Sequence, residues 1–427
     1  MKRNWISWSV ILLIAIGLPV AKAVSDFRKP LTPPTTAPSE PASDIQVQVM
    51  GKYIVGAANA SPDAKPQLIA QIDAMERMPA QRVAAAVLTG EVEGQAAAIE
   101  KLKAIEGDGD ATAFRQFYED GTPLPASVVE RFGFVAEVAQ SSGKPETDPQ
   151  RAAVLKASQR TLVTLVGAGL IGAGGAVVAL GLFITAIVLI SLGKVRPNLA
   201  PPAHANASAY VQAFALYLGT FVFGSIALAL IDHYQPGALP SGANFVPMFA
   251  AVILGAAWPL LRGVPWVSLR EDWGLHTGRS IFLEPLAGIA GYLAGLPIVA
   301  LGIGVTVLLT WLTKANVSHP IQKELLEHPL QMVLLAVVWA PITEELLFRG
   351  ALLSNLRVRY SPWVAAILSG VIFAAIHPQG WAAIPVLGSI GFVMAMVRQW
   401  RRSLLAPIAA HALNNGMIVT LLLLAAG

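Results

Sequence analysis

Long apolar stretches dominate the chain after residue 160, whereas the region before it is largely polar. The apolar half contains eight such stretches, which are separated by short polar connections. They cover about residues 161–192, 207–231, 244–262, 283–313, 329–356, 361–377, 381–398 and 403–425. A helix needs about 20 mostly apolar residues to cross a bilayer. The pattern therefore predicts an all-α fold, a polytopic membrane bundle of about eight transmembrane helices over residues 161–427.

The first 23 residues combine a basic start with an apolar run. Two basic residues precede apolar positions from Trp5 to Val20, and residues 21–23, Ala-Lys-Ala, have the small-x-small spacing of a cleavage site. This layout fits a removed signal peptide and equally a retained anchor helix. The run of about 16 apolar residues is short for a span, and the sequence leaves both options open. Either one places the next segment on the outer side of the membrane.

Residues 24–160 differ in composition from both neighbours. Residues 24–43 are rich in Pro, Thr and Ser, which is typical of an extended linker. Residues 44–160 are polar, with apolar positions three or four apart, and this spacing predicts a small helical extramembrane domain. Eighteen of the 26 acidic residues lie before position 161. No motif in this domain names a ligand, and recruitment of a substrate or partner is the role we consider for it.

Basic residues support an orientation in which residues 24–160 lie outside. The start of the chain and the predicted inner connections hold Lys2, Arg3, Lys194, Arg196, Arg262, Arg270, Arg279, Arg349, Arg357, Arg359, Arg398, Arg401 and Arg402. The predicted outer connections hold only Lys314 and Lys323. Short cytoplasmic loops carry an excess of Lys and Arg. Together with the signal-like start, this bias predicts a multi-pass protein of a bacterial plasma membrane, with residues 24–160 extracytoplasmic.

Composition adds exclusions to this picture. Hydrophobic residues make up 55% of the chain and charged residues 13%, whereas soluble domains carry about 25% charged residues. The chain has no cysteine, which excludes thiol catalysis, disulfides and thiolate metal sites. We expect the lipid bilayer and a protein or peptide substrate as partners, and no nucleic acid.

Few ionisable residues lie inside the apolar stretches. Of the eight acidic residues after position 160, only Glu344 and Glu345 lie within a long apolar run, and of the histidines only His377 and His411 do. A charge at the centre of a spanning helix costs about 2.5–3.5 kcal/mol on insertion scales. Two adjacent carboxylates at such depth need partners, and usually a function.

Spacing indicates how these groups face one another. Residues four apart share one face of a helix, and this spacing joins Glu345 to Arg349, Phe373 to His377, and His411 to Asn415. An ion pair between Glu345 and Arg349 would leave Glu344, about 100° round the helix, free to face a pocket. The polar groups meet only if the fifth, sixth and eighth apolar segments pack together.

Each of these residues also has an ordinary structural explanation. A single intramembrane histidine is often a packing residue, a Glu–Arg pair can be purely structural, and an asparagine commonly serves helix association. The combination of two acids, an arginine, two histidines and an asparagine is harder to explain in that way. We therefore interpret the set as a functional site.

Three motifs in this set resemble those of the CPBP family, which contains type II CAAX prenyl endopeptidases and bacterial proteins linked to bacteriocin processing and self-immunity. The motifs are Glu344-Glu345-x-x-x-Arg349, Phe373-x-x-x-His377 and His411-x-x-x-Asn415, complete and in order. The resemblance covers about residues 245–425. The first 160 residues lie outside it.

The resemblance implies an intramembrane endopeptidase of the glutamic type. Glu344 and His377 would activate a water molecule, while His411 and Asn415 would stabilise the oxyanion. Arg349 would hold the glutamate pair. On this mechanism no cofactor is required. The supporting residues are Glu345, Arg349 and Phe373.

A metal-dependent mechanism is the alternative form of the same activity. Glu344, His377 and His411 would then bind Zn²⁺, since two histidines and one carboxylate with an open position form a sound catalytic zinc site. The sequence has no His-Glu-x-x-His motif of the usual zinc proteases. It also has no Gly-x-Ser-x-Gly motif of the serine hydrolases.

Two non-enzymatic functions remain as alternatives. A non-catalytic scaffold or bacteriocin self-immunity protein would use the same polar site for binding, and a transporter would use it for proton relay. Transporters often carry inverted repeats with interrupted helices, and no such repeat is visible. The substrate is not identified by any motif.

One geometric difficulty accompanies the predicted site. Hydropathy places His377 near the outer end of its helix and Glu344 nearer the middle of the membrane. The helix that carries Glu344 is apolar beyond the length of one span, so we expect tilt to bring the two side chains level.

Overall fold

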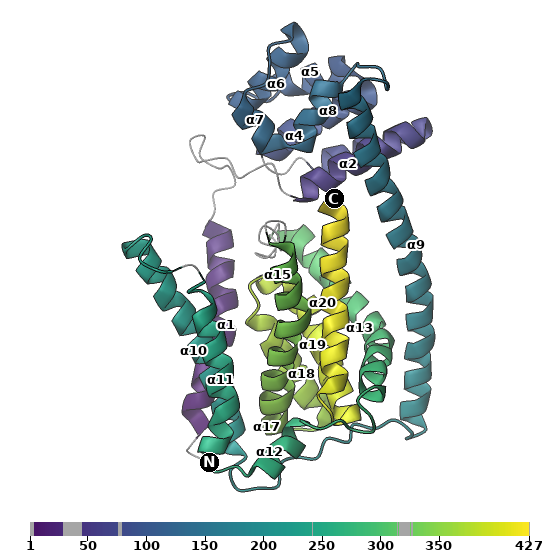
Figure 1. Cartoon of the computed structure of the whole chain (residues 1–427). Coiled ribbons are helices and arrows are strands. Elements are labelled where there is room, and N and C mark those ends of the chain that lie inside the picture. The colour runs from purple at the N-terminus through teal and green to yellow at the C-terminus, as the bar shows by residue number, and fades with distance from the viewer. Residues whose placement is uncertain are drawn as a thin grey trace. The chain divides into compact units, whose positions relative to one another are not determined.

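The computed structural model describes residues 4–28, 45–75, 79–240, 242–313, 315, 325 and 328–426, and in these ranges it is all helical (Figure 1). The predicted linker lies outside the described residues from position 29 onward. Lys2, Arg3, Lys314 and Lys323, which entered the charge count, also lie outside them. The expected all-α class is confirmed.

The chain divides into two compact units. One contains Met1–Lys29 and Gly174–Val419, and the other contains Pro30–Ala173 and Thr420–Gly427. The helix α9 runs unbroken from Pro149 to Ser191 and contributes to both. The predicted boundary at residue 160 falls within this continuous helix, so the domain limits drawn from composition stay predictions.

The polar unit is built from short helices. They are α2 (Ile45–Ala60), η2 (Pro62–Ala64), α3 (Lys65–Ala74), α4 (Pro79–Glu93), α5 (Gln95–Lys103), α6 (Gly109–Asp120), α7 (Ala126–Phe132), α8 (Phe134–Ser141) and the first part of α9. Their apolar faces meet in a core that includes Val83, Val87, Phe114 and Phe132. The three-to-four spacing of apolar residues explains this arrangement, because it gives each helix one buried face.

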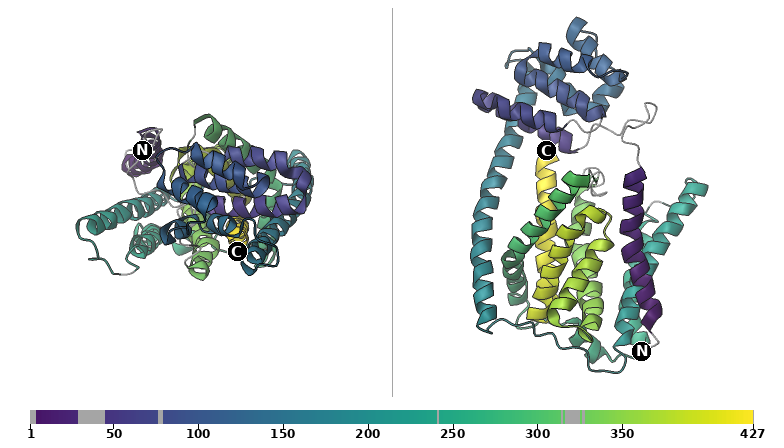
Figure 2. Two further views of the ribbon diagram at one scale, coloured as in Figure 1. Left: turned by 90° about the horizontal axis from the view of Figure 1, so that it is seen from above. Right: turned by 180° about the vertical axis from the view of Figure 1, so that it is seen from behind.

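The apolar unit contains the long helices (Figure 2). They are α1 (Trp5–Arg28), the second part of α9, α10 (Ser208–Tyr234), α11 (Phe245–Leu261), α12 (Trp266–Trp273), α13 (Leu283–Thr313), a composite helix over residues 329–357, α18 (Pro362–Ala375), η5 (Trp381–Ala383), α19 (Ile384–Arg401) and α20 (Leu405–Ala426). Each predicted apolar stretch is helical. Seven helices of the described chain are long and apolar enough to cross a membrane, α1 among them. The protein is therefore a multi-pass membrane protein.

Two of the eight predicted segments form helices shorter than a full span. These are α11 with 17 residues and α18 with 14 residues. At 1.5 Å per residue, α18 is about 21 Å long, against a hydrocarbon core of about 30 Å. Because α18 is shorter than a full span, the turn after it begins before the distance that a full-length transmembrane helix would cover.

The helix α1 packs into the bundle instead of standing apart from it. It contacts α10 and α18, and Ile11 and Ile14 are buried in the same cluster as Phe214 and Leu218 of α10. The described part of α1 thus belongs to the packed bundle, and the choice between a removed signal peptide and a retained anchor helix stays a prediction.

Close helix contact in the centre of the bundle depends on glycine. A Cβ atom on Gly370 of α18 would lie 2.6 Å from the carbonyl oxygen of Gly388 in α19, and one on Gly391 would lie 2.8 Å from the Cα of Gly370. Any side chain at these positions would separate the two helices. The contact holds the end of α18 against α19, and that end carries part of the candidate site.

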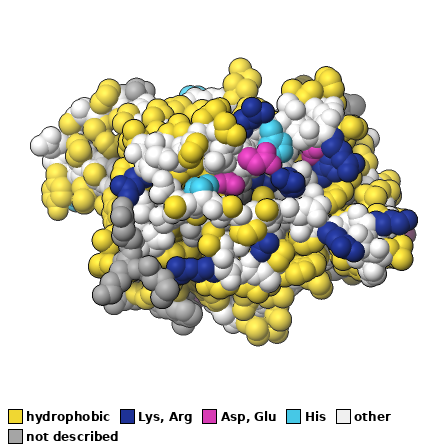
Figure 3. All heavy atoms as spheres, turned by 90° about the horizontal axis from the view of Figure 1, so that it is seen from below, with side chains coloured by type: hydrophobic (Ala, Val, Ile, Leu, Met, Phe, Trp, Pro, Cys, Tyr) yellow, Lys and Arg dark blue, Asp and Glu magenta, His cyan; other side chains and the backbone are white. Residues whose placement is uncertain are grey.

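Charged residues gather at the end of the bundle where α12 lies (Figure 3). Arg401 makes two hydrogen bonds to the buried carboxylate of Glu284, at 2.8 and 2.7 Å, and Arg402 pairs with Glu271 at 2.7 Å. This is the end that the excess of Lys and Arg assigns to the inner side. Arg349, which the charge count had placed in an inner connection, is instead fully buried within a helix.

Candidate active site

The helix that carries the glutamate pair changes its winding twice. Its parts are α15 (Pro329–Val333), η3 (Leu334–Trp339), α16 (Ala340–Glu345), η4 (Leu346–Leu352) and α17 (Leu353–Arg357). Both η3 and η4 are π-helical, with the amide of Ala340 donating to Leu335 and that of Leu353 donating to Phe348. Single π turns inside α-helices are common at functional sites. Here the two π segments enclose the short α-helical part that ends in Glu344 and Glu345.

Pro341 leaves one backbone carbonyl of the first π segment without a partner in its own helix. In the register set by Ala340 and Leu335, the next hydrogen bond would run from residue 341 to the carbonyl of Ala336, but proline has no N–H. That carbonyl accepts instead from Nδ2 of Asn415 in α20, at 2.8 Å. Because an unpaired carbonyl is costly in an apolar environment, this bond ties α20 to the helix of the glutamates.

Glu345 is the member of the glutamate pair that forms an ion pair. It is 0% exposed, and its Oε1 accepts from Nη1 of Arg349 at 2.9 Å and lies 2.9 Å from Nδ1 of His411. Arg349 also donates from Nη2 to the carbonyl of Gly391 in α19, at 3.0 Å. The predicted ion pair is present, and it joins three helices at one buried point.

Glu344 has no comparable partner among the described residues. Its side chain is 22% exposed, and its Oε2 takes part in no hydrogen bond within the described chain. Two imidazole nitrogens approach that oxygen, Nε2 of His411 at 3.8 Å and Nε2 of His377 at 4.0 Å. The two adjacent glutamates therefore have different surroundings, one sealed in an ion pair and one facing two rings across a gap.

His377 lies in the turn after α18, because that helix ends at Ala375 and not at residue 377 as the apolar pattern suggested. Its Nδ1 bonds to the carbonyl oxygen of Phe373, which places the hydrogen on Nδ1 and turns Nε2 toward Glu344. His377 and Glu344 therefore lie close together, with 4.0 Å between Nε2 and Oε2. The tilt expected from the sequence stays a prediction.

Phe373 contacts three members of the site. Its ring centroid lies 4.2 Å from that of His377 and 6.0 Å from that of His411, and the Arg349 guanidinium carbon lies 4.9 Å from the ring centroid. An aromatic face attracts a cation at this distance. The Phe373 ring therefore packs against both imidazoles and the buried guanidinium.

Asn415 was expected to face the same site as His411. The structure shows both on α20, but the described contacts of the Asn415 side chain are with the Ala336 carbonyl and with Asn414, whose Nδ2 donates to Asn415 Oδ1 at 2.9 Å. Tyr292 of α13 in turn donates to Asn414 Oδ1 at 2.6 Å. Reasoning from the sequence missed Tyr292 and Asn414 because it considered chiefly ionisable groups. The neutral side chain directly before Asn415 was the available signal.

The suggested zinc ligands can be tested against this geometry. Glu344, His377 and His411 are suitable ligand types, and each histidine has its Nδ1 against an oxygen atom, as metal-bound histidines usually do. However, bonds of 2.0–2.1 Å in a tetrahedral site place ligand atoms about 3.3 Å apart, and the distances here are 3.8 and 4.0 Å. No group of three His, Asp or Glu in the described chain has metal-binding geometry. The three side chains as positioned do not fit zinc, and we derive no step through a metal.

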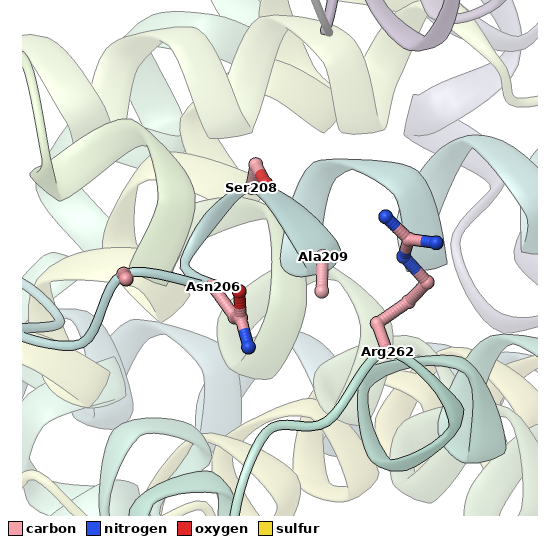
Figure 4. Close-up of a pocket in the computed structure, with 5 residues that line it drawn as sticks. Asn206, Ser208, Ala209 and Arg262 are labelled. Carbon is pink, nitrogen blue, oxygen red and sulfur yellow. The ribbon is translucent and has the colours of Figure 1, made fainter.

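A polar pocket of about 200 Å³ lies elsewhere, at the start of α10. It is lined by Ala205, Asn206, Ser208, Ala209 and Arg262 (Figure 4). Asn206 donates to the carbonyl of Gly263 at 3.3 Å. The pocket includes none of the residues that the motifs single out, and nothing in the structure indicates what would occupy it.

Comparisons with known proteins agree with the motifs. Residues 326–417 match the family of type II CAAX prenyl endopeptidases described as Rce1-like, and this match confirms the resemblance. An uncharacterized 24.3 kDa protein of Escherichia coli is 32% identical over 78 residues, which is 17% of this chain and 36% of that protein. The chain thus covers about a third of the length of this relative. No solved structure matches.

Proposed function

We propose that this protein is an intramembrane endopeptidase that hydrolyses a peptide bond of a membrane-associated protein or peptide. The single observation that carries the proposal is the contrast between the glutamates. Glu345 binds Arg349 and His411 through its Oε1, while its Oε2 has no hydrogen-bond partner among the described residues. Glu344 has no such ion pair, and its Oε2 faces two imidazole nitrogens at 3.8 and 4.0 Å and accepts nothing from the described residues. A purely structural polar cluster would give each carboxylate a cation or a donor, as Glu345 has in Arg349, since a carboxylate without either is costly away from water.

The convergence of acceptors explains how water would bind. His377 carries its hydrogen on Nδ1, so its Nε2 presents a lone pair toward Glu344 Oε2, 4.0 Å away. Two acceptors at this distance need a donor between them, and a water molecule can donate one hydrogen to each. Both hydrogen bonds increase the electron density on the water oxygen, which is the activation that a general base provides.

The reaction then proceeds by ordinary addition and elimination. The water oxygen bonds to the carbonyl carbon of the substrate, and Glu344, assisted by His377, takes up the released proton. The oxyanion accepts hydrogen bonds from the second amide hydrogen of Asn415 and from Nε2 of His411 when that ring carries both protons. As the C–N bond breaks, Glu344 returns the proton to the leaving nitrogen, and the products are a carboxyl group and an amine.

The predicted orientation in the membrane indicates on which side the substrate would be met. We infer that the protein lies in a bacterial plasma membrane with residues 24–160 on the extracytoplasmic side, as the distribution of Lys and Arg indicates. The polar unit would then meet proteins or peptides outside the membrane and recruit them.

The experiment that tests the proposal is quantitative N-terminal profiling of membranes. Membranes that contain the wild-type chain are compared with membranes that contain Glu344→Gln, which keeps the size of the side chain but cannot accept a proton as a carboxylate does. Glu271→Gln is the matched control, because Glu271 is exposed and pairs with Arg402 at the far end of the bundle. The three proteins are brought to equal abundance.

We expect a set of protein N-termini that depends on the wild type, persists in Glu271→Gln and disappears in Glu344→Gln. Those termini would identify the substrates. If the profiles of wild type and Glu344→Gln are the same under conditions that require the protein, the endopeptidase proposal fails. The site would then have a binding role, as in a scaffold or immunity protein.

A further inference from the structure

A line of three hydrogen bonds runs through Asn414 and Asn415. Tyr292 donates to Asn414 Oδ1 at 2.6 Å, Asn414 Nδ2 donates to Asn415 Oδ1 at 2.9 Å, and Asn415 Nδ2 donates to the Ala336 carbonyl at 2.8 Å. Every bond points the same way along the line. The bonds connect α13 and α20 with the π segment that precedes the glutamates.

The direction of this line matters because a carboxamide has a donor end and an acceptor end. The two ends have nearly the same shape, so only their hydrogen-bond partners decide which one faces the site. The Ala336 carbonyl can only accept, which requires the nitrogen of Asn415 on that side. Asn414 Nδ2 can only donate, which requires the oxygen of Asn415 on the other. The two constraints give the same orientation.

Tyr292 provides the start of the line. It is 2% exposed, in a helix that is otherwise almost entirely apolar. A hydroxyl buried there without a partner would be unfavourable, and Asn414 Oδ1 is its acceptor. With the Asn414 nitrogen turned to Asn415, the oxygen of Asn414 is left to accept from Tyr292, and this bond holds the Asn414 amide in that orientation.

We propose that Tyr292 and Asn414 are positioning residues that hold the amide of Asn415 with its NH₂ group toward the reacting carbonyl. The inference rests on the proposed function, in which Asn415 donates to the oxyanion. Neither residue touches the substrate. They act by preventing the amide from rotating to present its oxygen, which would repel an oxyanion instead of stabilising it.

The competing explanation is that the line only joins helices. Asparagine and tyrosine side chains commonly serve this purpose in membranes. The two explanations differ in what they predict for turnover. Loss of a positioning residue lowers kcat at constant KM, and the loss does not add to that of Asn415. Loss of a structural contact lowers folding stability and adds to any other change.

The test uses the purified full chain in liposomes and a synthetic peptide that spans a cleavage site found by terminus profiling. Asn415→Ala should lower kcat about 100-fold or more, as removal of one oxyanion donor does. Asn414→Leu should lower it about 10-fold or more, because a misplaced donor loses most of its effect. Tyr292→Phe should follow with a smaller loss. Thr310→Val, which also removes a hydroxyl from α13, is the control and should match the wild type.

The double variant Asn414→Leu/Asn415→Ala should be no slower than Asn415→Ala alone, with KM close to wild type and a thermal midpoint close to that of Asn415→Ala. Wild-type turnover in both Asn414→Leu and Tyr292→Phe, beside a slow Asn415→Ala, would overturn this inference and leave the proposed function standing. Additive losses, or losses confined to KM or stability, would overturn it as well. An unaffected Asn415→Ala, or a peptide that the wild type does not cleave, would overturn the catalytic assignment itself.

Discussion

At the scale of single residues, Glu344 and Glu345 are adjacent in sequence but have different partners. The spacing of four residues to Arg349 identified Glu345 as the paired acid, and the structure contains that ion pair at 2.9 Å. The same spacing argument left Glu344 free. The partners of Glu345 on other helices, His411 and the Gly391 carbonyl bound to Arg349, depend on long-range packing. Periodicity along one helix carries no information about them.

The buried ion pair gives the prediction at this scale. Arg349→Met should destabilise the protein by about 3–5 kcal/mol, because it leaves the Glu345 carboxylate buried without its cation. Arg349→Met/Glu345→Gln should recover part of that loss, since the uncompensated charge is gone. Thermal unfolding in detergent measures both. The control is Arg359→Met, at an exposed position, which should unfold like the wild type. Equal unfolding of Arg349→Met and Arg359→Met would refute the structural role of the pair.

At the scale of elements, hydropathy located the helices better than it described their interiors. The stretch 329–356 was expected as one long helix, and the structure divides it into alternating α and π turns. Apolar content cannot distinguish these windings, because both bury the same residues. Pro341 was a visible signal, yet its consequence, a free Ala336 carbonyl that Asn415 satisfies, requires knowledge of which helix lies beside it. For the same reason His377 was assigned to a helix that ends two residues earlier.

The packing of α1 gives the prediction for an element. Ile11 is 0% exposed against α10, whereas Leu13 on the same helix is 65% exposed. Ile11→Ala should therefore lower the free energy of unfolding by about 2–4 kcal/mol, and Leu13→Ala should change it little. Thermal midpoints of the two purified variants make the comparison. If both equal the wild type, α1 is not a structural part of the mature protein, and the signal-peptide option for residues 1–23 stands.

At the scale of the whole molecule, the two units differ in where their apolar side chains lie. Apolar side chains on the outside of α9, α10 and α13 are exposed, as suits a surface that faces lipid, while the short helices of residues 45–148 bury theirs. Hydropathy was sufficient to predict the all-helical fold, whereas the domain limits drawn from it stay predictions. It did not predict the place of α1 or the pairing of Glu284 with Arg401, because both depend on contacts between segments far apart in the chain. It also treated Arg349 as a surface charge.

Cleavage of a defined peptide by the purified chain in liposomes is the measurement that decides most directly whether these helices form a hydrolytic site. The wild type, Glu344→Gln and Glu271→Gln are compared with a peptide that contains a site from the terminus profiles, each with and without a chelator. We predict that Glu344→Gln lowers kcat by about 10²–10⁴-fold, the contribution typical of a general base. Glu271→Gln should cleave at the wild-type rate.

The chelator should leave the wild-type rate unchanged, because the distances from Glu344 Oε2 to His377 Nε2 and to His411 Nε2 exceed those between ligands of a tetrahedral zinc site. Loss of cleavage on chelation, restored by added Zn²⁺, would replace water activation by Glu344 and His377 with a metal mechanism at the same residues. A Glu344→Gln protein that cleaves as fast as the wild type would contradict the assignment of this site as the catalytic centre.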